Sequence, residues 1–162
     1  MQKIMKKYRK AQGFTLVELL IVVIIIGILA GMMMLSSGSA TDKAEAAKII
    51  ANMRTIKSAS LMFYADNDRY PTTGELAETS FDKYMDSKID TDKYKFDEVA
   101  EPATMGDGDA LVVYYDADTA GTTTGVLKKL AGMAKESGLF KSDLSAEYDG
   151  SSNPYMIIKK DI

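Results

Sequence analysis

Residues 14–35 read FTLVELLIVVIIIGILAGMMML, an apolar run that a single charged residue, Glu18, interrupts. As an α-helix the run would be about 33 Å long, at about 1.5 Å per residue, and the hydrocarbon core of a bilayer is about 30 Å thick. An apolar run of this length is typical of a membrane span rather than of a helix in a soluble core. We therefore expect residues 14–35 to cross a membrane as one helix.

The charges that flank this run indicate its orientation. Residues 1–13 carry five Lys or Arg residues and no acid, whereas few charged residues follow the run closely. Flanks rich in Lys and Arg stay on the cytoplasmic side of a span. We expect a single-pass membrane protein with its N-terminus in the cytoplasm and its C-terminal part outside.

The composition excludes several classes of function. The chain has 20 Lys+Arg and 23 Asp+Glu, and five of the cations lie in residues 1–13, so residues 14–162 have a net charge of 15 − 23 = −8. Nucleic acid binds mainly through Lys and Arg contacts to phosphate, so the sequence predicts no specific nucleic-acid partner. The chain has no Cys and no His, which removes disulfides, the commonest general base and the commonest zinc ligand. The sequence predicts no enzyme and no cofactor. A membrane-tethered Ser–Lys hydrolase is the competing hypothesis from another class, and no motif supports it.

A second helical pattern follows the apolar run. Residues 36–39 (SSGS) predict a poorly helical junction, because Ser and Gly are weak helix formers. From Thr41 to about Asp66, apolar residues recur at steps of three and four, which predicts an amphipathic helix. The expected buried stripe comprises Ala46, Ile49, Ile50, Met53, Ile56, Ser60, Phe63 and Tyr64.

The end of this helix is marked by Tyr70-Pro71, because the residue before a proline avoids the helical region. Thr72 and Glu75 then have the spacing of a capping box, which predicts a short helix from Thr73 to about Glu78 and another turn around residues 81–85.

The C-terminal part predicts a small sheet with one more helix. Residues 94–99, 110–116 and 154–159 are rich in β-branched and aromatic side chains and predict three antiparallel strands with one face on the amphipathic helix. Residues 126–136 have helical spacing and precede Ser137-Gly138, a fitting C-cap. The expected fold class is α+β, a long N-terminal helix packed against a small antiparallel sheet.

The start of the apolar run carries the functional signal. Residues 10–20 read KAQGFTLVELL, which resembles the prepilin cleavage and methylation signal of type IV pilins and of type II secretion pseudopilins. The resemblance implies a pilin-like fold and cleavage between Gly13 and Phe14 by a membrane prepilin peptidase, which then methylates the Phe14 amine. Gly13 suits such a site because a residue without Cβ lets a protease approach the backbone.

The resemblance also implies an assembly role for Glu18 and Thr15. A carboxylate inside a spanning helix is a functional candidate, because its charge is costly in hydrocarbon. In the bilayer, Glu18 lies only about 6 Å along the helix from Phe14, within reach of the headgroups. In a filament, its implied partner is the Phe14 amine of the neighbouring subunit, which would set the axial register of the subunits.

The resemblance orders the chain into four parts: a cleaved leader (1–13), a transmembrane and filament-core helix (14–35), the amphipathic half of the long helix (36–66) and a globular head (67–162). A second resemblance, at residues 63–72 (FYADNDRYPT), is to the segment that ends the long helix in major pseudopilins and in disulfide-free pilins.

Calcium is a weak expectation. Acidic pairs at Asp107 and Asp109, at Asp116 and Asp118, and at Asp90 and Asp92 offer the oxygen ligands that Ca²⁺ prefers, and some major pseudopilins bind calcium in a late loop. None of the pairs has EF-hand spacing, and Asp in such loops usually stabilises turns.

The function expected from these observations is a structural subunit of a type IV pilus, with a pseudopilin of a type II secretion or competence system as the alternative. The expected partners are other copies of the chain, a prepilin peptidase, an inner-membrane assembly platform and, before assembly, membrane lipid. The expected location is the bacterial cytoplasmic membrane, followed by an extracellular pilus or a periplasmic pseudopilus.

Overall fold

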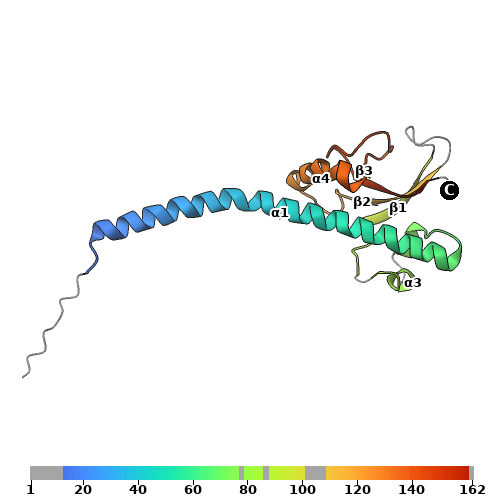
Figure 1. Ribbon diagram of the computed structural model, residues 1–162, viewed down its shortest axis with the longest axis horizontal. Helices are drawn as coiled ribbons and strands as arrows, with labels where there is room; N and C mark the ends of the chain where they lie inside the picture. Colours follow the sequence, from blue (N-terminus) through green and yellow to red (C-terminus); the bar gives the residue numbers. More distant parts are fainter. Residues whose placement is uncertain (1–12, 77–78, 86–87, 101–108, 161–162) are drawn as a thin grey trace, which may run out of the picture. The chain divides into compact units, whose positions relative to one another are not determined.

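The computed structural model of the protein describes residues 13–76, 79–85, 88–100 and 109–160 (Figure 1). Contacts along the chain divide it into two compact units, Met1–Gly38 and Ser39–Ile162. The second unit, called the head below, contains the sheet, the shorter helices and the C-terminal half of the first helix.

The long helix α1 runs from Leu16 to Asn67. It remains helical through residues 36–39, so the predicted poorly helical junction is wrong. The reason is that extending an existing helix costs little per residue, and one turn of Ser and Gly does not outweigh the long helical segments on both sides. The helix ends at Asp68, which adopts a left-handed φ of 54° and donates its backbone N–H to the Tyr64 carbonyl at 2.8 Å.

The C-terminal half of α1 buries one face in the head, as the periodicity predicted. Met53 and Ile56 are fully buried there, and the Ser60 hydroxyl is satisfied by the Ile56 carbonyl at 2.8 Å. Two residues differ from the expected stripe. Tyr64 is 39% exposed and lies outside it, whereas Ala59 is buried and belongs to it.

The sheet has four antiparallel strands in the order β1-β2-β4-β3. Strands β1 (Tyr94–Val99), β2 (Ala110–Tyr115) and β4 (Tyr155–Lys160) confirm the three predicted strands, and β3 (Leu139–Phe140) was not predicted. A strand of two residues carries no periodicity that could reveal it. Together with α1, this sheet confirms the expected α+β fold class.

The two faces of the sheet have different surroundings. Phe96, Leu111 and Val113 share a large buried cluster with α1, whereas Val112 and Tyr155 belong to a smaller cluster on the other face. The head therefore has its core between the sheet and the helices.

Helix α4 (Thr124–Ser137) lies beside the C-terminal half of α1. A Cβ on Gly125 would stand 2.0 Å from the Asp42 carboxylate, and Arg54 Nη2 donates to the Glu136 carbonyl at 3.5 Å, so the two helices are close at both ends of α4. The predicted C-cap is confirmed, because Gly138 has the left-handed φ of 68°. The helix begins two residues earlier than predicted, at a Thr123 cap.

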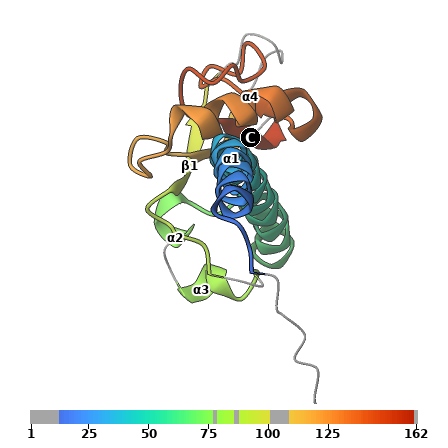
Figure 2. The ribbon, with the colours of Figure 1, turned by 90° about the vertical axis from the view of Figure 1, so that its left-hand side faces the viewer.

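The short helices α2 (Thr73–Leu76) and α3 (Thr79–Asp82) follow the end of α1. Figures 1 and 2 show them on the side of α1 opposite to α4. Phe81 of α3 is fully buried and packs edge-on against Phe96 of β1, with ring centroids 5.9 Å apart. This contact ties the segment after α1 to the core of the head.

Candidate functional site

The expected cleavage position lies just outside the first turn of α1. Gly13 and Phe14 are non-helical, and the Phe14 side chain is 87% exposed. Apart from the chain neighbours of Gly13, no described atom lies within 4 Å of the position that a Gly13 Cβ would take. The described part of the fold therefore has space for a side chain at position 13.

Thr15 and Glu18 form a capping box at the start of α1. The Thr15 backbone N–H and hydroxyl donate to Glu18 Oε2 at 2.8 and 2.7 Å, and the Glu18 backbone N–H donates to Thr15 Oγ1 at 3.2 Å. The pair thus satisfies backbone donors at a helix start, where no carbonyl of the preceding turn is available. Both residues were predicted to act in assembly, and this local role was not predicted, although the Thr-x-x-Glu spacing indicates it.

The capping box leaves part of the Glu18 carboxylate available. Both Thr15 donors bind the same oxygen, Oε2, and no described residue donates a hydrogen bond to Oε1. A carboxylate can accept about four hydrogen bonds, so a cation from another molecule can bind without breaking the cap.

The helix that follows presents apolar side chains on all sides. Every large apolar side chain described from Leu16 to Met34 is more than half exposed. Within the described chain, α1 is the one helix long and apolar enough to cross a membrane, by its length and composition. An apolar surface of this extent is expected either in lipid or against other apolar helices.

The segment at residues 63–72 forms a compact end to α1. The rings of Tyr64 and Tyr70 stack with centroids 4.6 Å apart, and Lys159 Nζ lies 5.9 and 5.4 Å from the two rings. Beyond them, one half of the predicted capping box is confirmed, because the Thr72 N–H donates to Glu75 Oε2 at 2.8 Å. The other half differs, because the Glu75 N–H donates to the Thr72 backbone carbonyl at 3.0 Å rather than to the Thr72 hydroxyl. Arg69 also pairs with Glu75, and its hydrogen bonds lower the pKa of that carboxyl to about 2.

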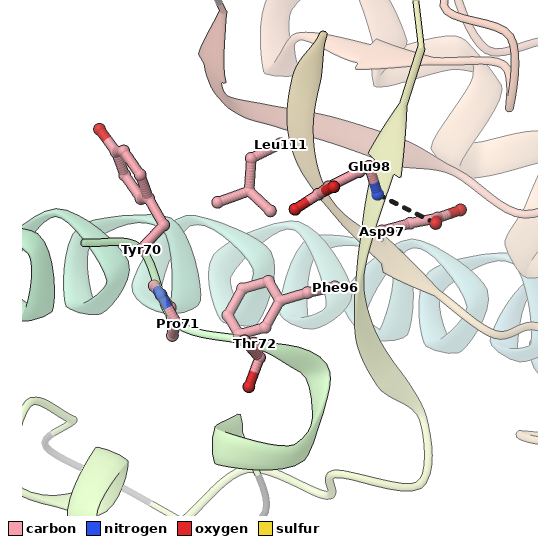
Figure 3. A pocket seen from close by; sticks show the side chains of 7 residues that line it. All are labelled: Tyr70, Pro71, Thr72, Phe96, Asp97, Glu98 and Leu111. Atoms are coloured by element: carbon pink, nitrogen blue, oxygen red, sulfur yellow. Dashed lines mark hydrogen bonds between the residues drawn. The ribbon is translucent and has the colours of Figure 1, made fainter. Parts of the chain in front are cut away.

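A shallow pocket of about 330 Å³ lies next to this segment, between the chain after α1 and the start of the sheet (Figure 3). The pocket is lined by Tyr70, Pro71, Thr72, Phe96, Asp97, Glu98 and Leu111. The Asp97 carboxylate accepts the Glu98 backbone N–H at 3.0 Å. The lining combines apolar surface with hydroxyl and carboxylate groups.

The calcium candidates lie apart or already have partners. The Asp116 carboxylate accepts Lys95 Nζ at 2.8 Å and the Thr119 N–H at 3.0 Å, which together lower its pKa to about 2. Asp90 pairs with Lys93 at 3.0 Å, and Asp107 lies outside the described residues. No group of three or more potential ligands, drawn from His, Cys, Asp and Glu, gathers within the part of the chain that the structure describes. Calcium binding at Asp107, Asp109, Asp116 or Asp118 stays a prediction.

Comparison with known proteins finds a family model that matches the N-terminal part of the chain. Residues 8–34 match the family model described as the prokaryotic N-terminal methylation motif. This range includes Gly13, Phe14, Thr15 and Glu18.

Two curated relatives share a longer stretch. Type II secretion system core protein G of Klebsiella michiganensis is 40% identical over 62 residues, which are 38% of this chain and 44% of the relative. The protein of the same name from Vibrio cholerae is 39% identical over 71 residues, 44% of this chain and 49% of the relative. The chain therefore spans about half the length of the curated relatives it matches. Among solved structures, the major type IV pilin PilA1 from Clostridium difficile aligns with a TM-score of 0.46 and 21% identity, over 74% of this chain and 98% of that one.

Proposed function

We propose that this chain, a member of the family of type IV pilins and type II secretion pseudopilins, is a pseudopilin that is cleaved after Gly13 and assembles into a filament with other copies of itself. The observation that carries the proposal is the methylation motif at the head of an apolar helix that is exposed on every side. A helix of this kind needs lipid before assembly and other apolar helices after it.

The proposal departs from the first expectation, which was a surface type IV pilus with a pseudopilin as the alternative. The curated relatives are core proteins of type II secretion, and they support the alternative better than the pilus. The segment at residues 63–72 is compatible with either function, because its resemblance is both to major pseudopilins and to pilins without disulfides.

The proposed mechanism follows from the geometry at the start of α1. The peptide bond between Gly13 and Phe14 lies outside the helix and is accessible to a prepilin peptidase at the cytoplasmic face. Cleavage creates an amine on Phe14, which the same enzyme methylates. In the filament, this cation pairs with Glu18 of the adjacent subunit through the free Oε1, while Oε2 stays bound to the Thr15 cap.

The proposed pairing sets the position of each subunit along the filament. A buried charge without a partner is strongly unfavourable, so only subunits at the correct axial step bring the amine and the carboxylate together. We further propose that an inner-membrane assembly platform adds the subunits. The role of the chain is then structural rather than catalytic.

Processing is tested on the protein purified from its own cells. We expect an intact mass that corresponds to loss of residues 1–13 and gain of one methyl group, with Phe14 at the N-terminus. Gly13→Val should leave full-length precursor in the membrane, because the added side chain hinders entry of the backbone into the peptidase. Normal maturation of this variant, judged by mass, would refute the cleavage step.

Deleting the gene separates the two family functions. A pseudopilin deletion should abolish release of folded proteins to the medium and leave surface filaments unchanged. Loss of surface filaments with normal protein release would instead assign the chain to a pilus.

A further inference from the structure

Strand β4 has an open edge in the head. Strand β3 pairs with Tyr155 and Met156 at the start of β4, whereas residues 157–160 pair only with β2. Among the described residues, no backbone hydrogen bond joins the outer side of residues 157–160 to another segment. In a strand, alternate residues direct their N–H and C=O groups outward, so this edge can accept another strand.

A groove of about 690 Å³ runs along this edge, between β4 and α1. Arg54, Lys57 and Leu61, which are spaced by three and four residues, line it from one face of α1. Lys159 and Lys160 line it from β4, so the described lining of the groove has four cationic side chains and no acidic one. Leu61 is 45% exposed and contributes apolar surface beside the charges.

A bulge in β4 places one of these cations toward α1. Leu111 and Val112 of β2 pair with Lys159 and Ile157, which leaves Ile158 as the extra residue. Ile158 is buried in the cluster that faces α1, and the next residue, Lys159, also reaches α1, where its ammonium lies near the Tyr64 ring. The bulge thus turns two consecutive side chains to one face and holds a cation at the groove.

The cations of the groove have no acidic partner in the described part of the head. The ion pairs there join Arg69 to Glu75, Lys93 to Asp90, Lys95 to Asp116 and Lys141 to Asp149. Arg54 donates only to the Glu136 carbonyl, at 3.5 Å. A cluster of four cations is unusual in a chain that carries −8 beyond residue 13, and it marks one surface as complementary to an acidic ligand.

We propose that this groove binds an extended acidic segment of a partner protein, which adds to the open edge of β4 as a fifth strand. The open edge provides backbone hydrogen bonds, Leu61 provides an apolar contact, and Arg54 and Lys57 bind carboxylates on the added strand. The proposal goes beyond the filament function and does not depend on it. Self-association of two copies of this chain through the same edge is the alternative outcome of the test.

The test uses the full chain in detergent micelles and the peptide Val-Glu-Val-Glu-Val-Glu, capped at both ends and labelled for fluorescence anisotropy. We expect saturable binding, together with slower amide hydrogen exchange at residues 157–160. The peptide Val-Lys-Val-Lys-Val-Lys should not bind. Arg54→Glu combined with Lys57→Glu should weaken binding at least tenfold, whereas Lys43→Glu combined with Lys48→Glu, on the same helix outside the groove, should have little effect.

Two N-methylated forms of the acidic peptide separate strand addition from charge attraction alone. Methylation of one alternate set of amides blocks the hydrogen bonds to β4, and methylation of the other set leaves them intact. We expect the two forms to differ at least tenfold in affinity. Equal affinity of both forms, unchanged binding after charge reversal of Arg54 and Lys57, or absence of peptide binding would overturn the proposal. Protection of residues 157–160 that depends on protein concentration without peptide would overturn it in favour of self-association.

Discussion

The two parts of α1 show how one helix serves two environments. From Leu16 to Met34 the described large apolar side chains are all more than half exposed. From Ala46 to Phe63 most of the apolar side chains lie along one buried stripe, and Leu61 and Met62 remain exposed. The first part of the helix has no polar face that could contact water. The second part has a polar face, which Lys43, Lys48 and neighbouring residues form. The period of the apolar residues therefore distinguishes a helix surface that contacts other molecules from a helix face that packs in the core of its own chain.

The largest expected effect is on assembly, from a change at Glu18. Glu18→Leu should abolish filaments, because it removes the carboxylate that we propose to pair with the Phe14 amine of a neighbour. Glu18→Gln sharpens the test, because Gln maintains the capping box with Thr15 but carries no charge. Electron microscopy of filaments from cells expressing each variant provides the measurement.

The control for this prediction is the head. Both variants should insert into the membrane and unfold at the same temperature as the unmodified protein, because Glu18 belongs to the first unit. If Glu18→Gln formed abundant filaments, the charge would not be required and the capping role alone would explain the residue.

The next effect is on folding and comes from the buried stripe. Ile56→Ala should lower the free energy of unfolding of the head by about 2–5 kcal/mol, because it leaves a cavity at a fully buried position. Ile24→Ala removes the same atoms from a side chain that is 52% exposed and should leave the head almost unchanged. Urea unfolding of the full chain in micelles, followed by tyrosine fluorescence, measures both. Equal losses of stability would break the distinction between the two parts of α1.

Periodicity explains which features could be predicted from the sequence. The end of α1, the three longer strands and the Gly138 cap each depend on local patterns or on Pro and Gly, and the structure has them close to the predicted positions. Tyr64 was assigned to the stripe on spacing alone, but it stacks on Tyr70, a contact that a later segment provides. Sequence patterns do not reveal such contacts between separate elements.

The candidate site shows the same limit. Gly13, Phe14, Thr15 and Glu18 are contiguous, so a sequence pattern identified them without the structure. The groove at β4 was not foreseen, because it joins Arg54 and Lys57 to a strand about one hundred residues later and depends on a bulge that no Gly or Pro marks. The Lys95–Asp116 pair was missed for the same reason, since its contact follows from the pairing of two strands.

The smallest expected effect concerns the pH dependence of the head. Hydrogen bonds from Lys95 and Thr119 lower the pKa of Asp116 to about 2, below its ordinary value of 3.8. Because the folded state favours the ionised form, Asp116 stabilises the fold above about pH 4, and this contribution is lost as the pH falls toward 2. Asp116→Asn retains an oxygen for the Thr119 N–H but loses the ion pair, so it should cost about 1 kcal/mol at pH 7 and much less at pH 2. Asp90→Asn breaks a more exposed ion pair with Lys93 and should change the free energy of unfolding little at either pH. Urea unfolding of both variants at pH 7 and pH 2 would show whether the partial burial of Asp116 makes its ion pair the more stabilising one.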